Sequence, residues 1–169
     1  MKKLVCSLML GSVLFASNYS DGMNAYKAEE FNKAIELFSK SNKIDNDARS
    51  IRNLGIMHMY GQGVSKNTTK GIDFLKKASN LGDSYAGNML GDMFASKKEF
   101  NEAAIWFEKG ANEGSLKSMT SLAYLYTYGD GVKKDSKKAF SWYDKAAKAG
   151  SIDAQINIAF LYISGQGVQ

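Results

Sequence analysis

Proline is absent from the 169 residues, and cysteine and histidine each occur only once, as Cys6 and His58. Because proline breaks helix interiors, its absence suits an almost wholly helical chain and does not suit a loop-rich fold. A single cysteine excludes an intramolecular disulfide. One cysteine and one histidine also fall short of the ligand set of a zinc site, so we expect no metal and no cofactor.

A strong excess of charge of one sign is also missing. The chain has 22 Lys and Arg against 17 Asp and Glu, which gives a net charge of +5. The lysines fall mostly on the predicted solvent faces of helices, without the dense basic stripe that nucleic-acid binding needs. We therefore expect no nucleic-acid partner.

Residues 1–17 have the pattern of a secretory signal peptide. Two lysines precede an apolar run, Leu4–Phe15, which is too short to cross a bilayer as a helix. Ala16 or Ser17 offers a small residue for cleavage, although Leu14 makes the site imperfect. The interpretation is a periplasmic or secreted protein without an integral membrane span in the mature chain. The alternatives are an uncleaved N-terminal anchor or a buried first helix, and if the segment is retained the protein is a cytosolic or membrane-anchored scaffold.

Three sets of landmarks recur along the chain with shared spacings. Leu-Gly, Leu-Ala or Ile-Ala pairs begin at positions 54, 90, 122 and 158, at spacings of 36, 32 and 36. Glycines at 82, 114 and 150 follow the last two spacings, and Gly-x-Gly-Val segments begin at 61, 129 and 165. Because the three sets shift together, the chain is predicted to be a repeat array.

Each repeat is predicted to be a pair of helices. The first segment spaces small, aliphatic and aromatic residues on one helical face, as at Ser118, Leu122, Ala123 and Tyr126. The second carries an apolar stripe at Ala139, Trp142, Tyr143 and Ala146. A glycine after each second helix suits a left-handed cap, where the missing Cβ removes the steric cost.

The spacings divide the rest of the chain into five units. We predict a divergent N-terminal repeat over 18–47, full repeats over 48–83 and 116–151, a short repeat without the Gly-x-Gly-Val loop over 84–115, and a half repeat over 152–169. The half repeat has a first helix and no second helix, which leaves an apolar face open. Either the chain is truncated or that face meets something else.

The segment Ser118–Gly150 satisfies nearly all of the pattern A-x-x-x-L-G-x-x-Y-x-x-G-x-G-V-x-x-D-x-x-K-A-x-x-W-Y-x-K-A-A-x-x-G. With this pattern the chain resembles the Sel-one-like repeat (SLR) family, a relative of tetratricopeptide repeats, from about Met23 to Val168. Three positions depart from it, since His58, Asn67 and Gly71 stand where the family has Tyr, Asp and Ala. The N-terminal repeat is closer to a tetratricopeptide repeat.

The resemblance implies an all-α fold, a right-handed α-solenoid of antiparallel helix pairs. It further implies a non-enzymatic interaction scaffold, placed by the signal peptide in the bacterial cell envelope, that binds a partner peptide or helix in a concave groove. Carried over from tetratricopeptide-type helices, the groove positions are Arg49, Arg52, Ile56, Met59, Tyr85, Asn88, Asp92, Lys117, Thr120, Tyr124, Thr127, Asp153, Ile156 and Phe160. The alternative is that Ile56, Tyr124 and Phe160 simply pack between neighbouring helices.

Catalytic constellations are not evident in the sequence. His58 takes the aromatic position of its repeat, so a packing role is favoured over catalysis, and the Gly-x-Gly-Val loops lack the Lys-Ser/Thr of a phosphate-binding loop. Exported cysteine-rich members of the family are often described as β-lactamases or penicillin-binding proteins. That remains the alternative function, although the chain lacks their paired cysteines and the motif set of serine β-lactamases.

If residues 1–17 are a cleaved signal peptide, the exported chain begins near Asn18 and contains no thiol. It would then carry 20 Lys and Arg against 17 Asp and Glu, a net charge of +3. N-terminal sequencing and the intact mass of the exported protein check this expectation. A secreted product that still begins at Met1 would contradict it.

Overall fold

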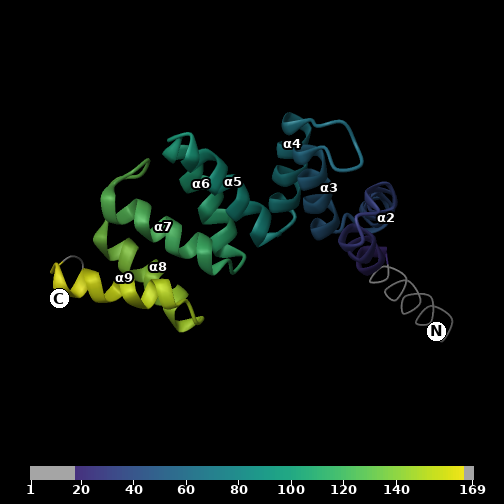
Figure 1. Ribbon diagram of the computed structural model, residues 1–169. Helices are drawn as coiled ribbons and strands as arrows, with labels where there is room; N and C mark the ends of the chain where they lie inside the picture. Colours follow the sequence, from purple (N-terminus) through teal and green to yellow (C-terminus); the bar gives the residue numbers. More distant parts are fainter. Residues whose placement is uncertain (1–17, 166–169) are drawn as a thin grey trace, which may run out of the picture. The chain divides into compact units, whose positions relative to one another are not determined.

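The structure, a computed structural model, describes residues 18–165, and within that range it is built of helices without strands (Figure 1). The all-α prediction is confirmed there. The predicted signal peptide and residues 166–169 of the last loop lie outside the described residues. The chain divides between Leu81 and Gly82 into two compact units, each of which is described by itself. No helix within 18–165 has the length and apolar character needed to cross a membrane.

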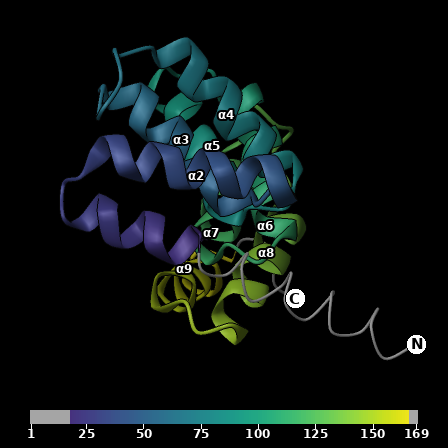
Figure 2. The same cartoon turned by 90° about the vertical axis from the view of Figure 1, so that its right-hand side faces the viewer.

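The first unit contains the helical residues 18–27, α2 (Phe31–Asp45), α3 (Ala48–Tyr60) and α4 (Thr68–Asn80). Figure 2 shows the segment 18–27 and α2 as neighbouring helices joined by a tight turn. Helix α3 packs against both α2 and α4. The segment 18–27, α2 and α3 share a buried core, against which Phe74 of α4 packs, and it consists of Ala25, Ala34, Phe38, Leu54 and Met57.

The second unit contains α5 (Ser84–Ser96), α6 (Phe100–Asn112), α7 (Leu116–Tyr128), α8 (Ser136–Lys148) and α9 (Ile152–Ile163). Each helix packs against the next, and α5 also contacts α7. One buried cluster, which includes Phe107, Leu122 and Leu125, lies between α6 and α7. A second, which includes Ala123, Tyr143 and Leu161, joins α7, α8 and α9.

Side-chain caps begin six of the eight helices α2–α9. An Asp, Asn or Ser side chain accepts a hydrogen bond from the backbone N–H three residues later, which satisfies one of the donors left free at a helix start. These caps are Asp47, Asn67, Asp83, Ser115, Asp135 and Ser151. The short polar residues between the predicted helices therefore fix where most helices begin.

Helices α2 and α6 begin differently, without a side-chain cap. Each follows a tight turn in which a non-glycine residue, Glu29 or Lys98, takes a left-handed conformation with φ of 60° or 63°. These are the two repeats without a Gly-x-Gly-Val loop. Where the loop is present, glycines such as Gly61 and Gly129 take the positive φ values at the helix end.

The Gly-x-Gly-Val loops pack against the preceding repeat. A Cβ on Gly63 would lie 2.8 Å from Cβ of Phe31 in α2, and a Cβ on Gly131 would overlap the backbone of Phe100 at the start of α6. Val132 packs against the buried cluster between α6 and α7. The loop thus adds contacts between successive repeats of one unit in addition to joining two helices.

Small residues let the two helices of a repeat approach closely. A Cβ on Gly55 in α3 would lie 2.9 Å from the backbone oxygen of Gly71 in α4, and a Cβ on Gly71 would lie 2.7 Å from the backbone oxygen of Gly55. Both clashes involve backbone atoms, which cannot rotate away as a side chain can. The departure of Gly71 from the family pattern therefore coincides with a close backbone contact.

Replacing Gly55 with Ala is expected to destabilise the protein. Overpacking of this kind costs about 1–3 kcal/mol, from which the gain in helix propensity of about 1 kcal/mol must be subtracted. Urea unfolding followed by circular dichroism measures the net loss. Ser141→Ala, at an exposed position of α8, is the matched control and should change stability by less than about 0.5 kcal/mol. A Gly55→Ala variant that is more stable than the wild type would contradict the close contact.

Candidate functional site

Two adjoining hollows in the second unit form the candidate site. One has a volume of about 380 Å³ and is lined by α7, α8 and α9, and the other has a volume of about 300 Å³ and is lined by α5 to α9. Tyr143 and Asn157 line both, so the hollows meet along one surface, here called the aromatic groove. Its lining residues are Asp92, Ala95, Phe100, Phe107, Thr120, Ser121, Tyr124, Leu125, Thr127, Tyr128, Tyr143, Asn157, Phe160, Leu161 and Ser164.

Exposed aromatic rings dominate the mouth of the aromatic groove. Tyr124 and Tyr128 follow each other on one face of α7, with ring centroids 4.5 Å apart, and are 50% and 62% exposed. Phe160 of α9 is 63% exposed. Large apolar rings that remain in water in a concave surface are typical of a binding site, because a ligand that covers them gains their burial energy.

Tyr143 forms the floor between the two hollows. Its side chain is buried, and its hydroxyl group is hydrogen-bonded to the side chain of Thr127. Burial raises the pKa of this phenol to about 12. The hydrogen bond with Thr127 opposes part of the rise, and electrostatic repulsion from the phenol groups of Tyr128 and Tyr124 adds to it. The phenol therefore stays neutral at physiological pH and can act in hydrogen bonding, with no activation as a nucleophile.

Charged groups are few in the aromatic groove, and several of its polar groups are hydrogen-bonded to neighbours. Asp92 of α5 forms an ion pair with Lys117 of α7 at 2.7 Å, so the two charges offset each other. Asn157 donates one amide hydrogen to the backbone oxygen of Asp153 at 2.8 Å. An Asn side chain has two donors and one acceptor, so a second N–H and the oxygen remain for a ligand. The groove thus combines aromatic surface with neutral hydrogen-bonding groups.

Five of the predicted groove residues line the aromatic groove, namely Asp92, Thr120, Tyr124, Thr127 and Phe160. Of the others in this unit, Tyr85, Lys117, Asp153 and Ile156 are exposed, whereas Asn88 is buried. The amide nitrogen of Asn88 has no hydrogen-bond partner in the described part of the chain. Whether these residues bind a partner stays a prediction.

The predicted positions in the first unit lie on α3. Arg49 donates to Asp47 at 3.1 Å and lies 4.2 Å from the centroid of the Tyr19 ring, so its guanidinium is held against neighbouring side chains. Arg52, Ile56 and Met59 are half-buried. Met59 also reaches towards Gly71 of α4, so part of this side chain serves the contact between the two helices.

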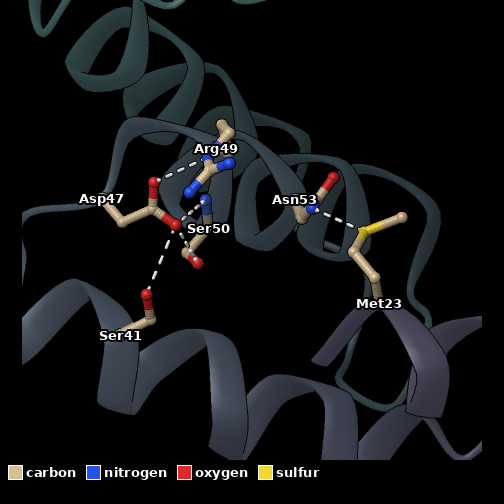
Figure 3. Close-up of polar contacts among 6 residues, drawn as sticks. All are labelled: Met23, Ser41, Asp47, Arg49, Ser50 and Asn53. Atoms are coloured by element: carbon tan, nitrogen blue, oxygen red, sulfur yellow. Dashed lines mark hydrogen bonds and ion pairs between the residues drawn. The ribbon is translucent and has the colours of Figure 1, made fainter. Parts of the chain in front are cut away.

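A polar cluster at the start of α3 explains the position of Arg49 (Figure 3). The carboxylate of Asp47 accepts hydrogen bonds from the hydroxyl groups of Ser50 and Ser41, at 2.7 and 3.3 Å, as well as from Arg49. Burial alone would raise the pKa of Asp47, but the bonds from Ser50 and Arg49 outweigh it and lower the pKa below its usual range. This cluster fixes the junction of α2 and α3.

Sequence reasoning missed several lining residues, above all Tyr128, Tyr143, Ser121 and Asn157. Ser121 and Asn157 each follow a predicted groove position by one residue and occupy equivalent places in successive repeats. The sequence could have indicated these two residues. A helical side chain covers the surface on the N-terminal side of its own Cα, so the residue that lines a given spot stands about one position later in the sequence than the spot itself. Tyr143 was assigned to the helix-packing stripe, and it serves both roles.

Metal and acid–base chemistry find little support here. No group of three or more His, Cys, Asp or Glu side chains within residues 18–165 is placed to hold a metal ion. His58 stacks on Phe74, with ring centroids 5.4 Å apart and planes within 9°. Burial lowers its pKa and the nearby Lys70 lowers it further, so the imidazole is neutral and packed in the helix pair.

The raised pKa of Tyr143 leads to a prediction about high pH. Folding favours the protonated phenol, so this stabilising contribution is complete below the ordinary pKa of about 10 and is lost as the pH rises towards 12. When tyrosine ionisation is followed by absorbance, one phenol should ionise at a pH near 12, above the others, and Tyr143→Phe should remove that step. Tyr60→Phe, at an exposed position, should leave that step in place. Survival of the step in Tyr143→Phe would contradict the assignment.

Solved structures of other proteins share the fold of this chain. A Sel1 repeat protein from Oxalobacter formigenes matches with a TM-score of 0.81 and 27% identity, over 89% of this chain and 63% of its own. The protective antigen c5321 of uropathogenic Escherichia coli strains, described as displaying an SLR fold, matches with a TM-score of 0.78 and 24% identity, over 92% of this chain and 35% of its own. The chain therefore spans less than two thirds of the length of these two proteins.

Helicobacter pylori cysteine rich protein B is a more distant structural match. Its TM-score is 0.53 at 24% identity, over 73% of this chain and 94% of its own, so the likeness concerns the fold alone. Together with the helix pattern, these matches confirm the predicted all-α solenoid of SLR type. Sel1 repeats generally serve as protein-interaction scaffolds and are typically non-catalytic.

The sequence itself matches the Sel1 repeat family over residues 48–83, 86–115, 116–151 and 152–169. These ranges cover more than two thirds of the chain, and they contain the helix pairs whose small and aromatic positions build the aromatic groove. The chain belongs to the Sel1 repeat family.

Proposed function

We propose that this protein is a non-enzymatic interaction scaffold of the bacterial cell envelope, which binds an extended peptide or a helix of a partner protein in the aromatic groove. The observation that carries the proposal is the set of exposed rings at Tyr124, Tyr128 and Phe160 around two adjoining hollows. The signal-peptide pattern of residues 1–17 supports the envelope location.

The size and chemistry of the hollows favour a peptide over a small charged metabolite. Hollows of about 380 and 300 Å³, joined at Tyr143 and Asn157, can each take a large side chain. Their lining has a single charged residue, Asp92, whose charge Lys117 offsets. A peptide with two apolar or aromatic side chains would fill the hollows while its backbone bonds to amide and hydroxyl groups such as Asn157.

The alternative of a β-lactam-binding or hydrolysing protein has no such support from the groove. Its lining serines are Ser121 and Ser164, and no histidine or lysine is among the lining residues. The hydroxyl of Ser164 bonds to the backbone oxygens of Phe160 and Leu161. A nucleophilic serine needs a base within hydrogen-bond reach. The single carboxylate of the lining, Asp92, is paired with Lys117 instead.

The groove is tested with peptides selected from a random displayed library against the purified protein, followed by calorimetry. Truncation of a ring at the centre of an interface typically costs about 2 kcal/mol, so Tyr124→Ala should weaken binding about 30-fold. Tyr60→Ala is the matched control, because this exposed ring lies on α3 outside the predicted groove, and it should change affinity less than twofold. Arg52→Ala, tested separately, reports on the positions predicted in the first unit.

Two results would contradict the proposal. One is peptide binding that is insensitive to Tyr124→Ala and to Phe160→Ala. The other is turnover of the chromogenic β-lactam nitrocefin by the purified protein that scales with protein concentration, remains after repurification, and is lost when Ser121 or Ser164 is replaced by Ala.

A further inference from the structure

The smaller hollow of the aromatic groove combines an apolar inner part with polar groups. Phe107 of α6 and Leu125 of α7 line it and are buried, whereas the ring of Tyr124 is half-exposed. The polar lining residues of this hollow are Asp92, Thr120, Ser121, Tyr124, Tyr143 and Asn157. A long side chain with an apolar stem and a polar end therefore fits its volume of about 300 Å³.

Thr120 offers this hollow a hydrogen-bond acceptor. Its hydroxyl group donates its single hydrogen to the backbone oxygen of Leu116, one turn earlier in α7, at 2.9 Å. The donor of the group is therefore used, and the lone pairs of the hydroxyl oxygen remain for a ligand. A ligand group that only accepts hydrogen bonds finds no donor at this residue.

Asn157 of α9 offers a second acceptor. The atom of its amide group that lies 2.8 Å from the backbone oxygen of Asp153 must be the nitrogen, because an amide oxygen has no hydrogen to donate. This contact fixes the orientation of the amide group, and its oxygen is left as an acceptor beside one N–H. Together, Thr120 and Asn157 favour a ligand group that carries several N–H donors.

Asp92 of α5 gives the same hollow a negative charge. Lys117 of α7 pairs with one carboxylate oxygen, Oδ2, at 2.7 Å, so Oδ1 remains an acceptor. The two side chains are 42% and 68% exposed, and exposed ion pairs of this kind contribute little to stability. Among the described residues that line the hollow there is no lysine, arginine or histidine. A cationic ligand group would therefore meet an available carboxylate oxygen, with Lys117 as its only competitor.

The first unit shows how this chain holds a guanidinium group. Arg49 donates from Nε to the carboxylate of Asp47 at 3.1 Å, and its guanidinium carbon lies 4.2 Å from the centroid of the Tyr19 ring. A carboxylate and a tyrosine ring thus bind one guanidinium group together. Asp92 and Tyr124 offer the same two groups in the smaller hollow, with no arginine of the hollow's own lining between them.

We propose that the smaller hollow binds an arginine side chain of the partner peptide, whose guanidinium group donates to Asp92 and stacks on the Tyr124 ring. The methylene stem supplies the apolar contact with Phe107 and Leu125. Arginine fits better than lysine, because its five N–H donors lie in one plane and can reach separate acceptors. The larger hollow has no charged lining residue and takes an apolar side chain. This inference rests on the proposed function and specifies the side chain that one of the two hollows takes.

The experiment uses the purified chain and, as probes, fluorescein-labelled peptides selected from a random displayed library. Only peptides whose binding Tyr124→Ala weakens are kept, so that each probe reports on the aromatic groove. Their sequences should share an arginine at one position. Citrulline has nearly the same shape as arginine without its charge, so replacing that arginine with citrulline should weaken binding about tenfold in fluorescence anisotropy.

Variants of the protein test the carboxylate and its competitor. Asp92→Asn should weaken binding of the arginine peptide about tenfold and of the citrulline peptide less than about twofold, because only the first loses a charged contact. Lys117→Met should strengthen binding of the arginine peptide about threefold, because it removes the cation that competes for Asp92. Asp144→Asn and Lys148→Met are the matched controls, since they make the same charge changes in an ion pair of α8 outside the lining residues. Both controls should change affinity less than about twofold.

Several outcomes would overturn the arginine assignment. These are groove-binding peptides without a shared arginine, equal binding of the arginine and citrulline peptides, or an equal loss of both with Asp92→Asn. A shared acidic residue whose contribution disappears with Lys117→Met would assign the opposite charge to the partner and reject the proposal. In all these cases peptides still bind in the aromatic groove, so the proposed function stands. A library that yields no peptide sensitive to Tyr124→Ala rejects both.

Discussion

Close approach between the two helices of a repeat is the constraint on which the other features depend. In α3 and α4 a glycine stands on each side of the contact, and a Cβ on either one would meet the backbone of the other helix. In α5 and α6 the space above Gly91 is filled by the ring of Phe107. Because the small side chain makes room for the neighbouring helix, the aromatic residues beside it can pack on both helices at once. Glycine in a helix interior costs about 1 kcal/mol, which these contacts offset.

The two faces of the first helix in a repeat have different roles. One face packs on its own second helix, and the other supplies the aromatic groove. Tyr143 connects the two roles, since it is buried between α7, α8 and α9 and also forms the floor of both hollows. Helix α9 has the groove face and the packing position, but its packing face is exposed within the described residues.

Much of the fold could be predicted because the information is local and repeated. Helix starts follow from capping side chains such as Asp47 and Ser115, and helix ends with glycine follow from the positive φ values that glycine tolerates. The groove was predicted less well. Tyr124 and Phe160 line it, but Ser121 and Asn157 were missed, because their lining role depends on the direction of side chains and on which helices lie opposite.

The sequence by itself determined the all-α class, the repeat periods and the family, because each depends on spacings within one or two helices. Only the tertiary structure decided that the Gly-x-Gly-Val loops press on the preceding repeat, and that Met59 packs towards Gly71. It also decided that rings from three helices meet around Tyr143. Those features depend on distances between residues far apart in the chain, which a periodic pattern leaves open, since the same spacing fits a residue that packs inside and one that lines a groove.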